Sequence, residues 1–164
     1  MDPYQKSYDI RWGDLDPNRH VANTTYMALL NQTRMDIMAD LGFTQAFLEK
    51  HQIGPVIFKE DFHYVREVHP NSRLRINIRM AGASQDWGIM RLAQRIFLPN
   101  GKLGVYSEVL FAWIDLNSRK LRIPPEELLK AYQAYPRTEN FAVIDPRDTR
   151  ASHVPYGDKI GEIS

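Results

Sequence analysis

The stretch Asp14–Asn23, which reads Asp-Leu-Asp-Pro-Asn-Arg-His-Val-Ala-Asn, gathers two carboxylates, two carboxamides and one imidazole. It leads directly into a long apolar pattern that is typical of a helix. The first backbone N–H groups of a helix point outward without partners and lie at the positive end of its dipole. A carbonyl oxygen placed there is polarised, and a neighbouring carboxylate is able to attack the carbonyl carbon or to activate water. The stretch therefore predicts a site that binds and attacks a carbonyl group.

The apolar pattern predicts a helix from Asn23 to Leu41. Its stripe, at three- and four-residue spacing, consists of Tyr26, Leu29, Leu30, Thr33, Ile37 and Leu41, and it is widened by Met27, Ala28 and Met38. Because the stripe is so wide, we expect the helix to be buried almost all round. Asn23 is a candidate N-cap, and Gly42 is a candidate C-cap because glycine enters the left-handed backbone region at little cost.

Strand patterns occupy much of the remaining chain, at residues 6–12, 56–65, 73–80, 90–98 and 105–114, and a short helix is expected at 124–132. Residues 73–80 alternate strictly, so the apolar set is expected to face a core, namely Leu74, Ile76, Ile78 and Met80. The alternate set is expected to face water or a partner, namely Arg73, Arg75 and Arg79. An Asn-Gly pair at residues 100 and 101 is typical of a tight hairpin. Together these elements predict an α+β fold, in which an antiparallel sheet curls around a long central helix.

Residues 1–134 are expected to form one domain, since 164 residues with 43% hydrophobic and 25% charged side chains are ordinary globular values. Residues 135–164 are richer in Pro, Asp and Arg, and their one apolar run is Phe141–Ile144. We expect them to form an irregular tail that packs on the surface or is partly disordered.

Composition argues against several classes of function. The absence of cysteine excludes disulfides, thiolate metal sites and a cysteine nucleophile. A net charge of +1 gives no indication of nucleic-acid binding, and no segment approaches the roughly 20 apolar residues of a membrane helix. His63 and His69 lack the spacing of metal ligands. We therefore expect a cytoplasmic protein with no cofactor, no metal and no membrane insertion.

The order of the elements, the pattern Asp-Pro-x-x-x-Val-x-Asn-x-x-Tyr that begins at Asp16, and Arg34 on the helix resemble the hotdog-fold acyl-CoA thioesterases of the 4-hydroxybenzoyl-CoA thioesterase type. The stretch 14–23 is also similar to a loop of plant acyl-ACP thioesterases, Asp-Leu-Asp-x-Asn-x-His-Val-Asn-Asn. The resemblance covers about residues 4–132. It implies a hotdog fold, hydrolysis of an acyl-CoA or acyl-ACP thioester, and a homodimer or homotetramer whose sites are built from two chains.

The resemblance also implies roles for four residues. Asp16 matches a carboxylate that either attacks the thioester or activates water. Asn23 matches a residue whose amide polarises the carbonyl, at a helix end that serves as the oxyanion hole. Asn18 and His20 match residues of the plant-type site, where Asn18 would hold substrate or water. His20 would orient the nucleophile or donate to the leaving sulfur.

The sequence departs from these relatives at two places. Many of them carry a glutamate base on the helix at the position of Asn31, and asparagine takes up no proton at neutral pH. The plant enzymes have Glu and Cys on a later strand, whereas this chain has His63 near the Glu position and no Cys. Asp16 is therefore the main candidate carboxylate, with Asp14 as its rival and Glu67 as a more remote choice. Each of the two aspartates is also compatible with a purely structural Asx-type turn.

The candidate substrate-binding residues are Tyr26, His63, Arg66 and Arg91. Guanidinium groups bind the phosphates of coenzyme A well. The arginines are explained equally well as residues of a solvated sheet face. Tyr26 also fits the core. Arg34 is expected to have a carboxylate or carbonyl partner, because burying it alone is costly. Apolar side chains that could line an acyl tunnel or simply fill the core are Met35, Phe58, Phe62, Trp87 and Phe111.

Three hypotheses on function follow. The first is an acyl-CoA thioesterase. The second is an enoyl-CoA hydratase of the same broad fold, whose usual loop Asp-x-Asn-Pro-x-His this chain does not reproduce. The third is a non-catalytic hotdog protein that binds an acyl thioester or a protein partner.

Overall fold

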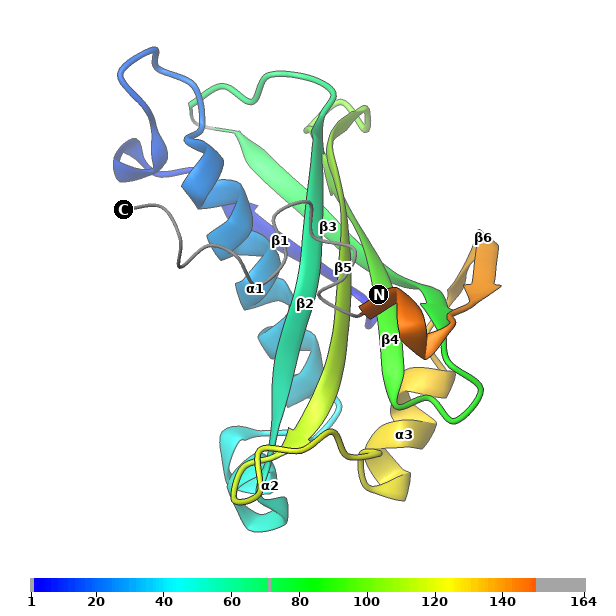
Figure 1. Cartoon of the computed structure of the whole chain (residues 1–164). Helices are drawn as coiled ribbons and strands as arrows, with labels where there is room; N and C mark the ends of the chain where they lie inside the picture. Colours follow the sequence, from blue (N-terminus) through cyan, green and yellow to red (C-terminus); the bar gives the residue numbers. More distant parts are fainter. Residues whose placement is uncertain (1, 71, 150–164) are drawn as a thin grey trace, which may run out of the picture.

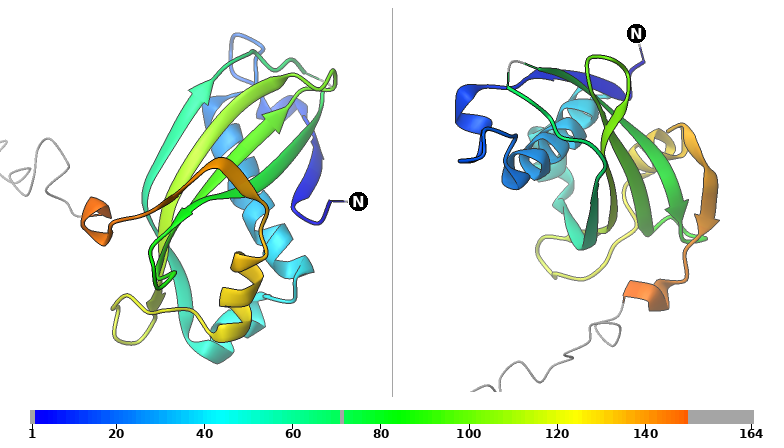
Figure 2. Two further views of the ribbon diagram at one scale, coloured as in Figure 1. Left: turned by 90° about the vertical axis from the view of Figure 1, so that its right-hand side faces the viewer. Right: turned by 90° about the horizontal axis from the view of Figure 1, so that it is seen from above.

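A computed structural model describes residues 2–70 and 72–149. Five antiparallel strands form its main sheet in the spatial order β1-β3-β4-β5-β2 (Figure 1). Their bounds are β1 Gln5–Asp9, β2 Ile53–Tyr64, β3 Arg73–Ala83, β4 Ile89–Phe97 and β5 Leu103–Asp115. The sheet curls around the long helix α1 (Asn23–Asp40), as the view from above in Figure 2 shows. The expected α+β hotdog fold, an antiparallel sheet wrapped around a central helix, is thus confirmed.

The strands divide their side chains between the two faces of the sheet by simple alternation. On β3 the four residues expected in the core are at most 1% exposed, whereas Arg73 and Arg75 are exposed and Arg79 is half-buried. The hairpin between β4 and β5 turns at Asn100 and Gly101, where Gly101 has a φ of 79°. The core therefore lies between α1 and the concave face of the sheet.

The C-terminus of α1 is closed by a Schellman motif. The Gly42 N–H donates to the Ala39 carbonyl at 3.0 Å, and the Phe43 N–H donates to the Met38 carbonyl at 2.9 Å. Gly42 has a φ of 92° and ends the helix through its left-handed backbone, as predicted, but it lies one residue beyond the C-cap, which is Leu41.

Replacing Gly42 with alanine is expected to destabilise the fold by about 1–2 kcal/mol, because a left-handed backbone costs a residue with a Cβ about that much. No heavy atom lies within 4 Å of the added Cβ, so the effect is purely conformational. Urea unfolding measures it, with Gly13→Ala as the matched control. Gly13 also has open space around it but lacks a positive φ. Equal stability of the two variants would contradict this explanation.

Two expectations about α1 require correction. Ala22, not Asn23, is the N-cap, and Asn23 is the first helical residue. The Asp14 carbonyl accepts hydrogen bonds from the Ala22 N–H at 2.9 Å and from Thr25 Oγ1 at 3.1 Å. These bonds fix the start of the helix, so α1 begins one residue earlier than expected. The helix is also not buried all round, because one sheet covers only one side of it. Met27 and Met35 remain 47% and 40% exposed.

The two outer edges of the sheet differ. Strand β6 (Arg137–Val143) runs parallel to β3 and pairs with it at residues 80, 82 and 83, whereas β1 pairs with residues 73–77. A Cβ on Gly82 would lie 2.6 Å from the Ala142 carbonyl oxygen, so this close pairing requires glycine. Strands β1 and β6 together cover the outer edge of β3. The outer edge of β2 pairs with no strand of the described chain.

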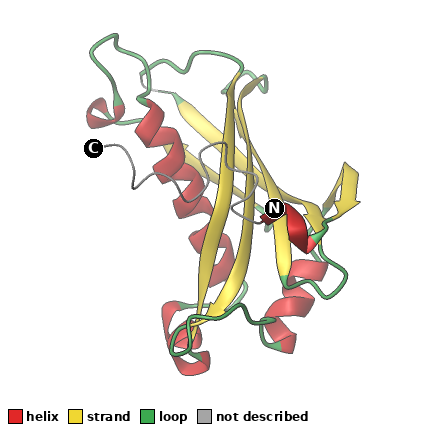
Figure 3. Ribbon diagram, viewed as in Figure 1, coloured by secondary structure: helices red, strands yellow, loops and turns green. Residues whose placement is uncertain are grey.

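Helices α2 (Gln45–His51) and α3 (Glu126–Gln133) complete the fold, with 3₁₀ turns at Trp12–Asp14 and Pro146–Thr149 (Figure 3). Regular structure thus continues beyond residue 134, where we expected an irregular tail. The cause is the apolar run Phe141–Ile144, because Ile144 is buried against Ile89 and Leu110 on the outer face of the sheet. Residues 150–164, the rest of the expected tail, lie outside the described residues. None of the helices in the described part of the chain has the length and apolar character needed to span a bilayer.

Candidate active site

Asp16 closes a tight loop that ends beside α1. Its Oδ1 atom accepts hydrogen bonds from the backbone N–H groups of Asn18 at 2.8 Å and His20 at 3.1 Å. The backbone N–H of Asp16 donates to the His20 carbonyl at 2.8 Å, and Arg19 takes a φ of 63° to complete the turn. One carboxylate oxygen therefore makes the Asx-type turn that the sequence allows. The other, Oδ2, has no hydrogen-bond partner among residues 2–70 and 72–149.

The N-terminus of α1 follows this loop after two residues. The Thr24 N–H is occupied by the side-chain oxygen of Asn23 at 2.9 Å. The Asn23 N–H itself has no acceptor within the described ranges. A free N–H at the positive end of an 18-residue helix is a suitable donor to an oxygen that gains negative charge.

Loop and helix end form one side of a hollow of about 340 Å³. The end of β2 and the segment that follows it form the other side. The polar and aromatic side chains around this hollow are Asp16, His20, Asn23, Tyr26, Tyr64, Arg66 and Glu67. Five of them were candidate site residues from the sequence, and Glu67 was the remote alternative carboxylate. The hollow therefore gathers most of the predicted site in one place.

His20 and Tyr26 are two side chains of this hollow that can form hydrogen bonds with a substrate. His20 Nε2 lies 3.5 Å from Glu67 Oε2, and both side chains are exposed to solvent. Burial raises the pKa of Tyr26 to about 12, so its phenol keeps its proton at neutral pH. The Tyr26 ring contacts the Tyr64 ring, with 5.6 Å between their centres. Tyr64 was missed because neither periodicity nor the resemblance singled it out.

The structure does not bring all the predicted residues together. The Asn18 side chain is exposed and is not part of the lining, although its N–H holds Asp16. His63 and Arg91 lie on the outer face of the sheet, near Tyr106 and Glu108 respectively. Asp14 also points elsewhere, because its Oδ2 accepts the Arg11 N–H at 2.7 Å. Of the two aspartates, only Asp16 faces the hollow.

Arg34 has the partner that the sequence predicts. Its Nη1 atom lies 3.0 Å from Glu60 Oε1 on β2 and 2.9 Å from Gln94 Oε1 on β4, and Nη2 donates to Asn31. The side chains of Arg34 and Glu60 are 14% and 11% exposed, and Gln94 is fully buried. This network ties α1 to the middle of the sheet. Glu60 was not identified from the sequence, because only the register of β2 turns it toward the helix.

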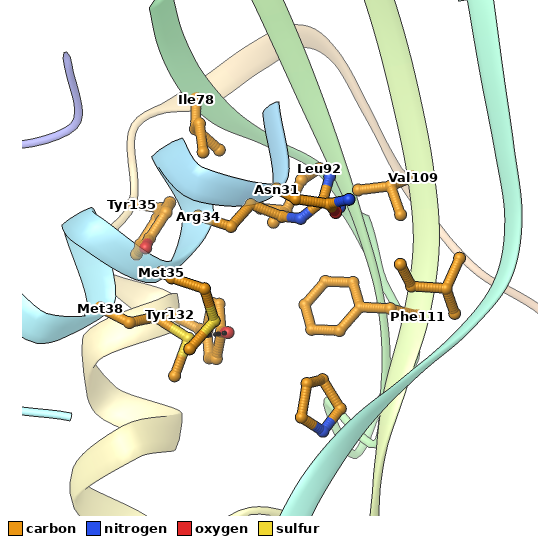
Figure 4. A pocket seen from close by; sticks show the side chains of 12 residues that line it. Asn31, Arg34, Met35, Met38, Ile78, Leu92, Val109, Phe111, Tyr132 and Tyr135 are labelled. Atoms are coloured by element: carbon orange, nitrogen blue, oxygen red, sulfur yellow. Dashed lines mark hydrogen bonds between the residues drawn. The ribbon is translucent and has the colours of Figure 1, made fainter. Parts of the chain in front are cut away.

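A separate apolar cavity of about 260 Å³ lies between the second half of α1 and the sheet (Figure 4). Of the apolar tunnel candidates, Met35 and Phe111 line it, and Phe58, Phe62 and Trp87 do not. Tyr132 and Tyr135, near the C-terminal end of α3, close one side. Asn31 lies about 12 Å along α1 from Asn23, at 1.5 Å per residue, so the cavity is distinct from the hollow at Asp16.

The chain belongs to the thioesterase-like superfamily, whose family model matches residues 10–132. No curated protein sequence matches it significantly. The narrower resemblances, to the 4-hydroxybenzoyl-CoA type and to the plant acyl-ACP enzymes, stay predictions.

Many solved structures share the fold at low sequence identity. The protein SAV2348 from Staphylococcus aureus, solved in complex with CoA, is 15% identical over 82% of this chain and 87% of its own, with a TM-score of 0.73. Slr0204 from Synechocystis, a 1,4-dihydroxy-2-naphthoyl-CoA thioesterase, is 14% identical over 80% and 96%, with a TM-score of 0.72. YbaW from Escherichia coli, described as a probable thioesterase, is 24% identical over 80% and 98%, with a TM-score of 0.67.

Proposed function

We propose that this protein hydrolyses acyl thioesters at the hollow between Asp16 and the N-terminus of α1. The observation that supports the proposal is that the two oxygen atoms of the Asp16 carboxylate have different hydrogen-bond surroundings. Oδ1 is fixed by two backbone N–H groups, while Oδ2 and the Asn23 N–H, which belong to residues lining the same hollow, have no hydrogen-bond partner among residues 2–70 and 72–149. A fixed carboxylate next to a fixed oxyanion donor is what attack on a carbonyl requires.

In the proposed reaction the thioester carbonyl oxygen accepts a hydrogen bond from the Asn23 N–H. Asp16 Oδ2 either attacks the carbonyl carbon, to give an anhydride that water then cleaves, or takes a proton from water that attacks directly. In both routes the carbon–sulfur bond breaks, and the thiolate takes up a proton. His20 is the suitable donor, since it lines the same hollow and its Nε2 atom lies 3.5 Å from Glu67 Oε2.

The thiol carrier is proposed to be coenzyme A or acyl carrier protein. Both present the acyl group on the same phosphopantetheine arm, and Arg66 at the edge of the hollow carries a charge that suits a phosphate. The CoA bound to the Staphylococcus aureus relative supports a CoA thioester.

The protein is proposed to assemble as a homodimer, or as a tetramer of such dimers, through β2 and the adjacent flank of α1. The outer edge of β2 is twelve residues long and pairs with no strand of the described chain, and Ile57 and Phe58 beside it are 47% and 38% exposed. Met27 and Met35 continue this apolar surface onto α1. A long free edge flanked by apolar side chains is unfavourable in water, and a second copy paired across a two-fold axis would cover it.

Met27→Lys is expected to weaken the dimer at least about tenfold in dissociation constant, because it buries a charge without a partner. Light scattering after gel filtration measures this, since the wild type should have two or four times the 19.1 kDa of one chain. Val143→Lys is the control, because Val143 is 70% exposed on β6, away from β2. A monomeric wild type, or equal dissociation of both variants, would argue against this interface.

Free-thiol release from a panel of short, long, branched and aromatic acyl-CoAs tests the proposed function. Release from at least one member is the expected result. Loss of the conjugated absorbance of crotonyl-CoA without thiol release would instead favour a hydratase. Tight binding of acyl-CoA without either reaction would favour a non-catalytic binding protein.

A further inference from the structure

The Tyr26 hydroxyl lies at the active-site hollow, but the proposed reaction does not use it. Tyr26 is 5% exposed, and it lines the hollow together with Asp16 and Asn23. Within residues 2–70 and 72–149 its hydroxyl group donates no hydrogen bond. The hydroxyl group of a buried tyrosine normally finds a hydrogen-bond partner. A donor without an acceptor at the wall of a hollow indicates that a bound ligand supplies the acceptor.

The direction of the Tyr26 side chain brings this hydroxyl to the N-terminus of α1. Tyr26 follows Asn23 by three residues, so the two share one face of the helix, about 4.5 Å apart along its axis. Helical side chains lean toward the N-terminus, so the long Tyr26 side chain extends back over the turn that contains Asn23. The Val68 backbone N–H approaches the hydroxyl oxygen, and the Val68 carbonyl accepts the Val21 N–H at 3.2 Å. Because Val21 precedes α1 by two residues, these contacts place the hydroxyl beside the start of the helix.

The proposed oxyanion hole contains one backbone donor, the Asn23 N–H. A carbonyl oxygen has two lone pairs and accepts two hydrogen bonds. We propose that the Tyr26 hydroxyl is the second donor of the oxyanion hole and donates to the thioester oxygen as this oxygen gains negative charge. The inference rests on the proposed function, because it places the thioester carbonyl at the N-terminus of α1. Tyr26 is then a catalytic residue, since it touches the reacting oxygen.

The surroundings of the hydroxyl keep its proton in place for this role. Burial raises the pKa of Tyr26 to about 12, and the neighbouring Tyr64, Asp16 and Glu67 add to the effect. The group is therefore neutral throughout the pH range of an enzyme assay and donates a hydrogen bond without losing its proton. A donor that is fixed and shielded from water stabilises a developing negative charge more strongly than water does.

Tyr26→Phe removes the hydroxyl and keeps the ring, which contacts the Tyr64 ring. It is expected to lower kcat for thiol release by about a hundredfold, the usual effect of losing one oxyanion donor. KM should stay within a few-fold, because the bond strengthens only as charge develops. Tyr135→Phe is the matched control. Tyr135 is also 5% exposed, but it lines the apolar cavity instead of the hollow, so kcat should stay near the wild-type value.

Infrared spectroscopy separates a bond to the carbonyl oxygen from a role in packing. Benzoyl-CoA and hexanoyl-CoA, each labelled with ¹³C at the thioester carbonyl, are bound to the Asp16→Asn variant so that turnover does not interfere. The carbonyl stretch of at least one ligand is expected to move to lower frequency on binding, because hydrogen bonds polarise the carbonyl. Adding Tyr26→Phe should move it part of the way back, and adding Tyr135→Phe should leave it unchanged.

A kcat of Tyr26→Phe within a few-fold of the wild type would overturn the inference, as would a carbonyl stretch that does not respond to this substitution. Equal effects of Tyr26→Phe and Tyr135→Phe, or no shift on binding for either ligand, would also overturn it. The proposed function fails separately. If the wild type releases no thiol but the Tyr26-dependent shift is present, hydrolysis is excluded and the hydrogen bond to the carbonyl stands.

Discussion

Asp16→Asn is expected to lower kcat/KM for thiol release by at least about a hundredfold. The amide keeps an oxygen that can accept the Asn18 and His20 N–H groups, so the loop should keep its shape. It removes the negative charge and basicity of Oδ2, which in the proposed reaction either attacks the carbonyl or takes the proton of water. The loss should therefore fall on the chemical step and leave acyl-CoA binding nearly unchanged.

Asp14→Asn is the matched control for this variant. Asp14 lies two residues earlier and makes a comparable backbone hydrogen bond, from the Arg11 N–H, but it does not face the hollow. Its activity is expected to stay within a few-fold of the wild type. Equal losses in the two variants would mean that loop structure, rather than a carboxylate in the site, explains the effect of Asp16→Asn.

Arg34→Ala is expected to cost about 3–5 kcal/mol of folding free energy, the largest stability effect that we predict. The substitution leaves Glu60 buried beside Gln94 without its cation, and it also removes the bond to Asn31. Urea unfolding followed by tryptophan fluorescence measures the change, because Trp113 is fully buried in the same core.

Two comparisons separate this effect from a general loss of charge. Lys130→Ala removes an exposed ion pair with Glu126 on α3 and should leave the unfolding midpoint within experimental scatter. The double variant Arg34→Met with Glu60→Leu replaces both charges by apolar groups and should recover most of the loss. If Arg34→Ala were as stable as Lys130→Ala, the network would not contribute as we infer.

The features that the sequence predicted are those that local periodicity and local turns determine. The alternation of β3, the hairpin at Gly101 and the end of α1 at Gly42 each depend on a few neighbouring residues. Strand β6 could not be predicted in this way. Its pairing with β3 joins residues nearly sixty positions apart, and its seven residues show no clear alternation.

The same distinction applies to the candidate site. Asp16, His20 and Asn23 come together because the loop that holds them is closed by its own hydrogen bonds. His63 and Arg91 depend on the face of a strand, and a shift of one residue in register reverses that face. Arg91 stands between the buried Met90 and Leu92, so the alternation of β4 turns it outward.

Tyr132 belongs to a third case. The sequence placed it on a short helix after the sheet, and α3 does form there. Its position in the apolar cavity, however, results from packing against Met38, Phe111 and Trp113, which come from α1 and β5. Contacts between such distant segments are tertiary properties that no local pattern encodes.

The most direct test of the account is a crystal structure of the Asp16→Asn variant soaked with an acyl-CoA that the wild type hydrolyses. We expect the thioester carbonyl oxygen about 2.7–3.1 Å from the Asn23 backbone nitrogen, with the carbonyl carbon next to the side chain of residue 16. A thioester bound elsewhere, or one whose carbonyl points away from the N-terminus of α1, would contradict the proposal that this loop and helix end form the active site.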